Sequence, residues 1–171
     1  MTAGTRRAIF GAGCYWGAEA AFRRVPGVVD ASVGFMADSL CGRGVAGSDD
    51  DAHVRRQVEV VVVDYSPDSV TYQDLLDVFW GCHDPTRSPY DGEGKPDMER
   101  SVLFVADSGQ KSSADAAVAA VAASGRFDAP VTTAVAAAGH FHRAAEDQQR
   151  YLEKNEGVVC SLKHHPATAA E

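Results

Sequence analysis

The segment Gln57–Tyr65 constrains the fold of this 171-residue chain more than any other segment. It reads Gln-Val-Glu-Val-Val-Val-Val-Asp-Tyr, and β-branched residues of this kind favour strands. Its valines occupy consecutive positions instead of alternating with polar residues, which is typical of a strand buried on both faces. We therefore predict a sheet that has this strand at its centre.

Shorter apolar runs and turn residues predict the other elements. A helix should follow Cys14 and stop at Pro26-Gly27. Because strands and helices do not alternate strictly, we expect an α+β fold. It should be a single domain over residues 1–171, a two-layer sandwich of a mixed β-sheet with packed helices and an irregular C-terminal tail. The remaining predicted elements are strands at 8–10, 28–35, 101–105 and 131–135, and helices at 71–80, 111–124 and 144–154.

The charge and the hydropathy pattern exclude several kinds of partner. The net charge is −8, whereas nucleic acids and anionic membranes are bound mainly by basic patches. No apolar run approaches the ~20 residues of a membrane span. The first residues lack the apolar stretch of a secretory signal. We therefore expect a cytoplasmic protein that binds neither nucleic acid nor membrane.

Cys14 is the strongest candidate for a reactive group. The chain has four cysteines, Cys14, Cys41, Cys82 and Cys160, too widely spaced for a small disulfide scaffold. Cys14 follows a glycine-rich turn and opens a predicted helix, where the helix dipole and free N–H groups favour a thiolate. Tyr15 and Trp16 come next and are expected to form an apolar wall for a methyl or thioether group.

These residues resemble the active-site signature of the methionine sulfoxide reductase A family. The resemblance rests on GAGCYWGAE at residues 11–19 and continues through EVVVVDYSP at 59–67 and YQDLLDVFW at 72–80, followed by His83-Asp84-Pro85. It ends with AAEDQQRYL at 144–152 and GVVC at 157–160, and so covers most of the chain in the family's order. Membership of this family implies reduction of a methionine-type sulfoxide to the thioether.

The resemblance also implies roles for individual residues. Cys14 would attack the sulfoxide and become a sulfenic acid, and Glu59 would give a proton to the oxygen. Cys160 would condense with Cys14 to form a disulfide, although Cys41 competes for this role, whereas Cys82 is expected to pack at a helix end. No bound cofactor or metal is implied; an external dithiol reductant such as thioredoxin would restore the thiols.

The chain departs from the family around the sulfoxide oxygen. A family tyrosine before Arg-Ser falls on Glu99, and another tyrosine is missing between residues 36 and 58. The family's Gly-Asn-Asp falls on Gly92-Glu93-Gly94, so that its aspartate is missing too. Loss of oxyanion-type donors typically costs several kcal/mol of transition-state stabilisation. The polar side chains available to replace them are Tyr90, Glu93, Glu99 and His53.

Three other interpretations follow from these departures. The scaffold is either retuned to a different small sulfoxide or used for another reaction of Cys14, or it is an inactive binding module. Retention of Cys14 argues against the inactive module. A metal site at His140-Phe141-His142 or His164-His165 is the weakest alternative, because a convincing set of cysteine, histidine and carboxylate ligands is lacking.

Overall fold

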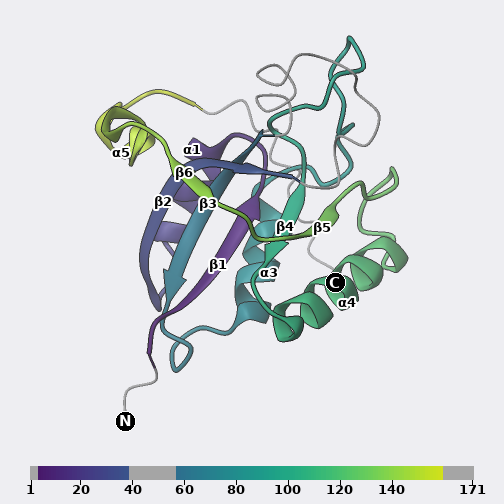
Figure 1. Ribbon diagram of the computed structural model, residues 1–171, viewed down its shortest axis with the longest axis horizontal. Helices are drawn as coiled ribbons and strands as arrows, with labels where there is room; N and C mark the ends of the chain where they lie inside the picture. The colour runs from purple at the N-terminus through teal and green to yellow at the C-terminus, as the bar shows by residue number, and fades with distance from the viewer. Residues whose placement is uncertain (1–3, 39–56, 160–171) are drawn as a thin grey trace.

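The computed structural model describes residues 4–38 and 57–159, which form a sheet with helices against it (Figure 1). The strands are β1 (Arg6–Gly11), β2 (Val28–Ala37), β3 (Gln57–Tyr65), β4 (Val102–Val105), β5 (Ala134–Ala137) and β6 (Phe141–Arg143). The helices are α1 (Tyr15–Arg23), α3 (Tyr72–Cys82), α4 (Ser108–Ala123) and α5 (Tyr151–Lys154), with a 3-10 turn at Glu146–Gln148.

The sheet confirms the central position predicted for β3. Its order is β5-β4-β1-β3-β2-β6, in which β4 and β5 run parallel and the other neighbours antiparallel. β3 is flanked by β1 and β2, and its residues Val60 to Val63 are all buried. The consecutive valines are therefore explained by burial on both faces of a mixed sheet.

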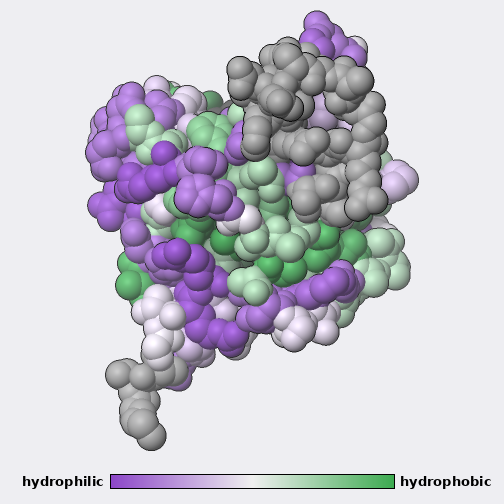
Figure 2. All heavy atoms as spheres, in the orientation of Figure 1, coloured by the Kyte–Doolittle hydropathy of each residue, from purple (hydrophilic) through white to green (hydrophobic). Residues whose placement is uncertain are grey.

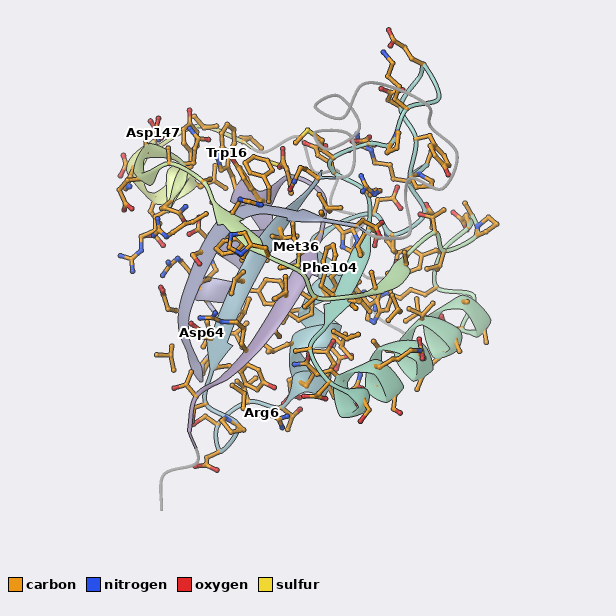
Figure 3. All side chains as sticks on the ribbon, viewed as in Figure 1. Arg6, Trp16, Met36, Asp64, Phe104 and Asp147 are labelled. Carbon is orange, nitrogen blue, oxygen red and sulfur yellow. The ribbon has the colours of Figure 1, made fainter. Side chains whose placement is uncertain are left out.

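Two apolar clusters lie on opposite faces of the sheet. The larger one packs α1, α3 and α4 against side chains such as Phe10, Val61 and Leu103. The smaller one contains Met36 and Phe104, which Figure 3 labels next to the chain that leads from β5 to β6. In Figure 2 this face shows apolar side chains at its centre with hydrophilic ones around them. The predicted α+β sandwich of sheet and helices is confirmed.

Several element boundaries follow from local capping. Thr71 caps α3 through a reciprocal pair of hydrogen bonds with Asp74, which confirms the predicted start of that helix. Asp107 caps α4 by accepting from the N–H of Gln110, so the helix begins three residues before the predicted Lys111. Among the described residues, no helix has the length and apolarity needed to cross a membrane.

Two predictions near the C-terminus were wrong. The strand predicted at 131–135 lies instead at Ala134–Ala137, where it pairs with β4. The helix predicted at 144–154 is broken into a 3-10 turn and α5, because Arg150 adopts a left-handed conformation with φ of 52°. The N–H of Arg150 donates to the buried carboxylate of Glu19 at 2.9 Å, and this tertiary contact holds the break.

Candidate active site

Cys14 lies at the junction of β1 and α1, as predicted. β1 ends at Gly11, where a side chain would come within 2.8 Å of Val58. Gly13 then adopts a φ of 72°, a conformation that glycine takes without strain. Cys14 is the N-cap residue of α1 and is half-buried, and its carbonyl accepts the N–H of Ala18 at 3.3 Å. Its thiol is therefore accessible at the positive end of a nine-residue helix.

Glu59 reaches this junction from the centre of the sheet. The N–H of Tyr15, the first residue of α1, donates to Oε2 of Glu59 at 3.2 Å. Burial raises the pKa of Glu59, the hydrogen bond from Tyr15 opposes the rise, and the negative charge of Glu99 adds to it. The carboxyl group thus retains a proton to higher pH than an ordinary glutamate does.

Glu99 is the third acidic group of the site. The Sγ of Cys14 and one carboxylate oxygen each of Glu59 and Glu99 lie within 4.8 Å of one another. The backbone N–H of Glu59 donates to the carbonyl of Met98 at 2.8 Å, which fixes the approach of Glu99 to β3. Arg87 binds Glu99 at 2.6 Å. We refer to Cys14, Glu59 and Glu99 as the acidic triad.

Aromatic side chains form one side of the site. Tyr15 is buried, whereas Trp16 is half-buried and stacks on Tyr151 of α5, with ring centroids 3.9 Å apart. Nε1 of Trp16 donates to Oε1 of Gln148 at 3.2 Å, and the Tyr15 hydroxyl donates to the same oxygen at 3.5 Å. Figure 3 shows Trp16 beside the segment that carries Asp147. The C-terminal segment, through Gln148 and Tyr151, therefore contacts and orients the two aromatic side chains that were predicted to form the wall.

Comparison with known proteins identifies the kind of protein that carries this site. The family model described as "Peptide methionine sulfoxide reductase" matches residues 6–171. The chain belongs to the peptide methionine sulfoxide reductase family. The similar protein MsrA of Methanoculleus marisnigri is 43% identical over 154 residues, which are 90% of this chain and 93% of that protein.

Solved structures similar to this chain have the same fold. Methionine sulfoxide reductase A of Corynebacterium diphtheriae is 31% identical with a TM-score of 0.72, covering 98% of this chain and 82% of that one. Reduced Mxr1 of Saccharomyces cerevisiae is 25% identical with a TM-score of 0.73, covering 92% and 90%. Mxr1 is also known in complex with Trx2, where it matches at a TM-score of 0.60 and 21% identity, covering 86% and 84%.

The predicted site residues of this family member divide into two groups. Cys14, Glu59, Tyr15 and Trp16 come together at the start of α1, as the contacts above show. Cys160, predicted to form the disulfide, lies outside the described residues. The same holds for its competitor Cys41 and for the two histidines His164 and His165.

Of the three candidates to replace the missing family donors that the structure describes, Tyr90, Glu93 and Glu99, one reaches the site. Glu99 belongs to the acidic triad. Tyr90 is exposed, and the exposed Glu93 forms an ion pair with Lys95. His53 lies outside the described residues. Sequence reasoning missed Arg87, which holds Glu99, because an arginine in a polar loop gives no signal of its partner.

Two residues near the signature motifs are structural. Cys82 ends α3 in the core, as predicted, and burial raises its pKa to about 12. His83 is also buried, and its ring nitrogens bond the carbonyl of Phe79 and the hydroxyl of Ser101, both at 2.7 Å. Burial lowers the pKa of His83 to about 4, so its imidazole is neutral and fixed.

The expectation of a site without a metal ion stays a prediction. In the acidic triad, Glu59 accepts an N–H from the backbone and Glu99 is bound by a guanidinium group. His140 and His142 lie with ring centroids 4.5 Å apart, but both side chains are exposed.

Proposed function

We propose that this chain reduces methionine sulfoxide to the thioether with Cys14 as the nucleophile. The observation that carries the proposal is the thiol of Cys14 at the start of α1, within 4.8 Å of the carboxyl group of Glu59. It occurs in a chain that belongs to the peptide methionine sulfoxide reductase family. The names of its relatives favour methionine sulfoxide over another small sulfoxide or an inactive module.

The chemistry assigns one role to each group. The Cys14 thiolate attacks, the S–O bond of the sulfoxide breaks, and the cysteine sulfur loses two electrons while the substrate sulfur gains them. The oxygen is transferred to Cys14, whose sulfur forms a new S–O bond, and delivery of one proton to that oxygen gives the sulfenic acid. Glu59 supplies that proton, because burial keeps its carboxyl group protonated at higher pH than usual.

The aromatic wall supplies the binding surface. Trp16 offers an indole face to the substrate methyl group, and Tyr15 closes the wall beside it, with ring centroids 6.3 Å apart. Desolvation raises the pKa of Tyr15 to about 12, and the charges of Glu59 and Cys14 add to the rise. The phenol therefore stays neutral and adds no repulsion to the sulfoxide oxygen.

The cycle is completed by thiols outside the described residues. Cys160 is the proposed resolving cysteine: it condenses with the sulfenic acid, releases water and leaves a disulfide. A thioredoxin-like protein reduces that disulfide, a proposal that the complex of Mxr1 with Trx2 supports. We place the cycle in the cytoplasm, where thiols are kept reduced, and we treat residues 1–171 as one functional domain.

Turnover with defined sulfoxides tests the proposal. The full chain is supplied with dithiothreitol and with each enantiomer of free and of peptide-bound methionine sulfoxide. We expect the wild type and Cys82→Ala to produce methionine, and Cys14→Ser to produce none. Cys82 is a matched control because its thiol is buried in the core at the C-terminal end of α3. Full activity of Cys14→Ser, or no turnover of any sulfoxide by the wild type, would overturn the proposal.

A further inference from the structure

The loop between α3 and β4 brings a carboxylate side chain, that of Glu99, into the site. Glu99 lies where the family resemblance leads one to expect a tyrosine, and its side chain is about one-third exposed at 33%. Arg87 binds both Glu99 and Asp97, at 2.6 Å and 2.7 Å. The N–H of Glu99 donates to Oδ1 of Asp97 at 2.9 Å, so the three side chains form one connected unit.

This unit is attached rigidly to the core. The side chain of Arg100 is 2% exposed, and its guanidinium group donates to the carbonyl of Asp97 at 2.7 Å. The same side chain lies 3.5 Å from the buried carboxylate of Asp38 at the end of β2. Met98 is bonded to the backbone of Glu59. Both neighbours of Glu99 in the chain, Met98 and Arg100, are therefore anchored, and they hold its carboxylate near Cys14 and Glu59.

We propose that Glu99, fixed by Arg87, is a positioning residue that keeps the reactive proton on Glu59. This inference rests on the proposed function and assigns to Glu99 a role other than direct contact with the oxygen. Arg87 holds the carboxylate of Glu99 in an ion pair, and a second negative charge within 4.8 Å of that carboxylate is costly in a half-buried site. Glu59 avoids that cost by holding its proton.

The charged groups around Glu59 agree with this assignment. From α1 it faces the thiol of Cys14 and the N–H of Tyr15. On β2 the residue opposite it is apolar, Phe35. From the loop it faces Asp97 and Glu99, which raise its pKa, and Arg87, which lowers it.

The same arrangement resets the site after the reaction. When Glu59 has given its proton to the oxygen, three carboxylates, those of Glu59, Glu99 and Asp97, and the guanidinium group of Arg87 face each other. The repulsion between the carboxylates favours prompt reprotonation of Glu59 from solvent. A tyrosine at position 99 would donate a hydrogen bond directly to the sulfoxide oxygen. Glu99 instead acts indirectly, through its effect on the proton of Glu59.

A titration of Glu59 tests the inference without any turnover. The full chain, carrying Cys14→Ser and glutamate labelled with carbon-13 at the side-chain carboxyl, is titrated by NMR, with the signal assigned by Glu59→Gln. We expect Glu99→Gln to lower the titration midpoint of Glu59, because it removes the charge and keeps the shape. Glu99→Asp should retain most of the wild-type midpoint. Glu93→Gln is the matched control, because Glu93 is an exposed acid of the same loop.

The reaction supplies the second measurement. The rate of sulfenic acid formation on Cys14 is followed by mass spectrometry against pH with a peptide methionine sulfoxide. In Glu99→Gln the alkaline decline of this rate should begin at a lower pH than in the wild type. For each pH unit by which the decline is displaced, the rate on the alkaline side should be about tenfold lower than the wild-type rate. Glu99→Asp should largely restore the wild-type profile.

Each outcome has a defined meaning. An unchanged midpoint of Glu59 in Glu99→Gln would overturn the inference, as would a moved midpoint with an unmoved rate profile. If the wild type reduces no sulfoxide, the proposed function fails, while the titration still decides whether Glu99 holds the proton on Glu59.

Discussion

The indole ring of Trp16 and the phenol ring of Tyr151 are stacked almost parallel, with centroids 3.9 Å apart and an angle of 8° between their planes. The two residues come from opposite ends of the chain, α1 and α5. The contact covers one face of the indole. The C-terminal segment therefore acts on the binding wall directly, although it supplies no residue to the acidic triad as described.

Tyr151→Ala should weaken substrate binding more than it slows chemistry. A stacked aromatic pair contributes about 0.5–1.5 kcal/mol, so we expect KM for a peptide methionine sulfoxide to rise about two- to tenfold. Steady-state kinetics measure the effect, and Tyr151→Phe, which keeps the stack, should match the wild type. Equal KM values for Tyr151→Ala and the wild type would show that Trp16 is oriented without the stack.

Gln149 ties the C-terminal segment to β2. Its buried amide accepts the N–H of Val33 and donates to the carbonyls of Val33 and Ala144, each at 2.9 Å. Gln149→Ala leaves these backbone groups without the amide, which costs about 1–3 kcal/mol of unfolding free energy. Urea denaturation measures the loss. The neighbouring Gln148→Ala is the control: it should raise KM through Trp16 and affect stability less, because Gln148 is half-buried.

The sequence predicts those parts of the fold in which local pattern and tertiary burial agree. The valines of β3 indicate burial on two faces, and Thr71 with Asp74 marks the start of α3, because each signal is contained within a few residues. The segment 144–154 has a helical composition, yet Glu19 holds Arg150 in a left-handed conformation. A contact 131 residues away leaves no trace in a local pattern.

The sequence likewise predicts only the part of the site that a local pattern encodes. A contiguous motif at a strand-to-helix turn indicates Cys14, Tyr15 and Trp16. The position of Glu99 in the site depends on a loop whose course is set by the bonds of Met98 and Arg100 to the sheet. Its partner Arg87 is twelve residues away in a polar segment, so neither the ion pair nor its effect on Glu59 is visible in the sequence.

His83 should make stability fall in mildly acid solution. Burial lowers its pKa from 6.5 to about 4 in the folded protein, whereas in the unfolded chain it titrates near 6.5. Between these values the unfolded state binds the extra proton, so stability is complete above pH 6.5 and is lost as pH falls towards about 4. The difference between the pKa of His83 in the unfolded and in the folded state corresponds to about 3 kcal/mol of unfolding free energy.

A substitution isolates this contribution. In His83→Gln, the decrease in unfolding free energy between pH 6.5 and about 4 should be about 3 kcal/mol smaller than in the wild type. Denaturant unfolding at several pH values measures it. His142→Gln, whose side chain is exposed, controls for the loss of a histidine as such. Parallel pH curves for the wild type and His83→Gln would contradict the argument.

Cys160 should be the thiol that resolves the oxidised enzyme. Tyr151 lies against Trp16, two residues after Cys14, and Cys160 follows Tyr151 by nine residues. Tyr151 begins the short helix α5, so the segment that leads to Cys160 starts beside the helix that Cys14 opens. Cys82 does not compete, because it is buried and its pKa is raised to about 12.

One equivalent of substrate without reductant distinguishes the two remaining thiols. In Cys160→Ser the sulfenic acid should accumulate on Cys14, where a dimedone adduct reports it by mass spectrometry. In Cys41→Ser a disulfide between Cys14 and Cys160 should form as in the wild type, since the resolving thiol is intact. A disulfide between Cys14 and Cys41 in the wild type, with normal resolution in Cys160→Ser, would transfer the role to Cys41. The reductant in the cell would then have to open a different bond, formed with the segment between β2 and β3 instead of the C-terminal one.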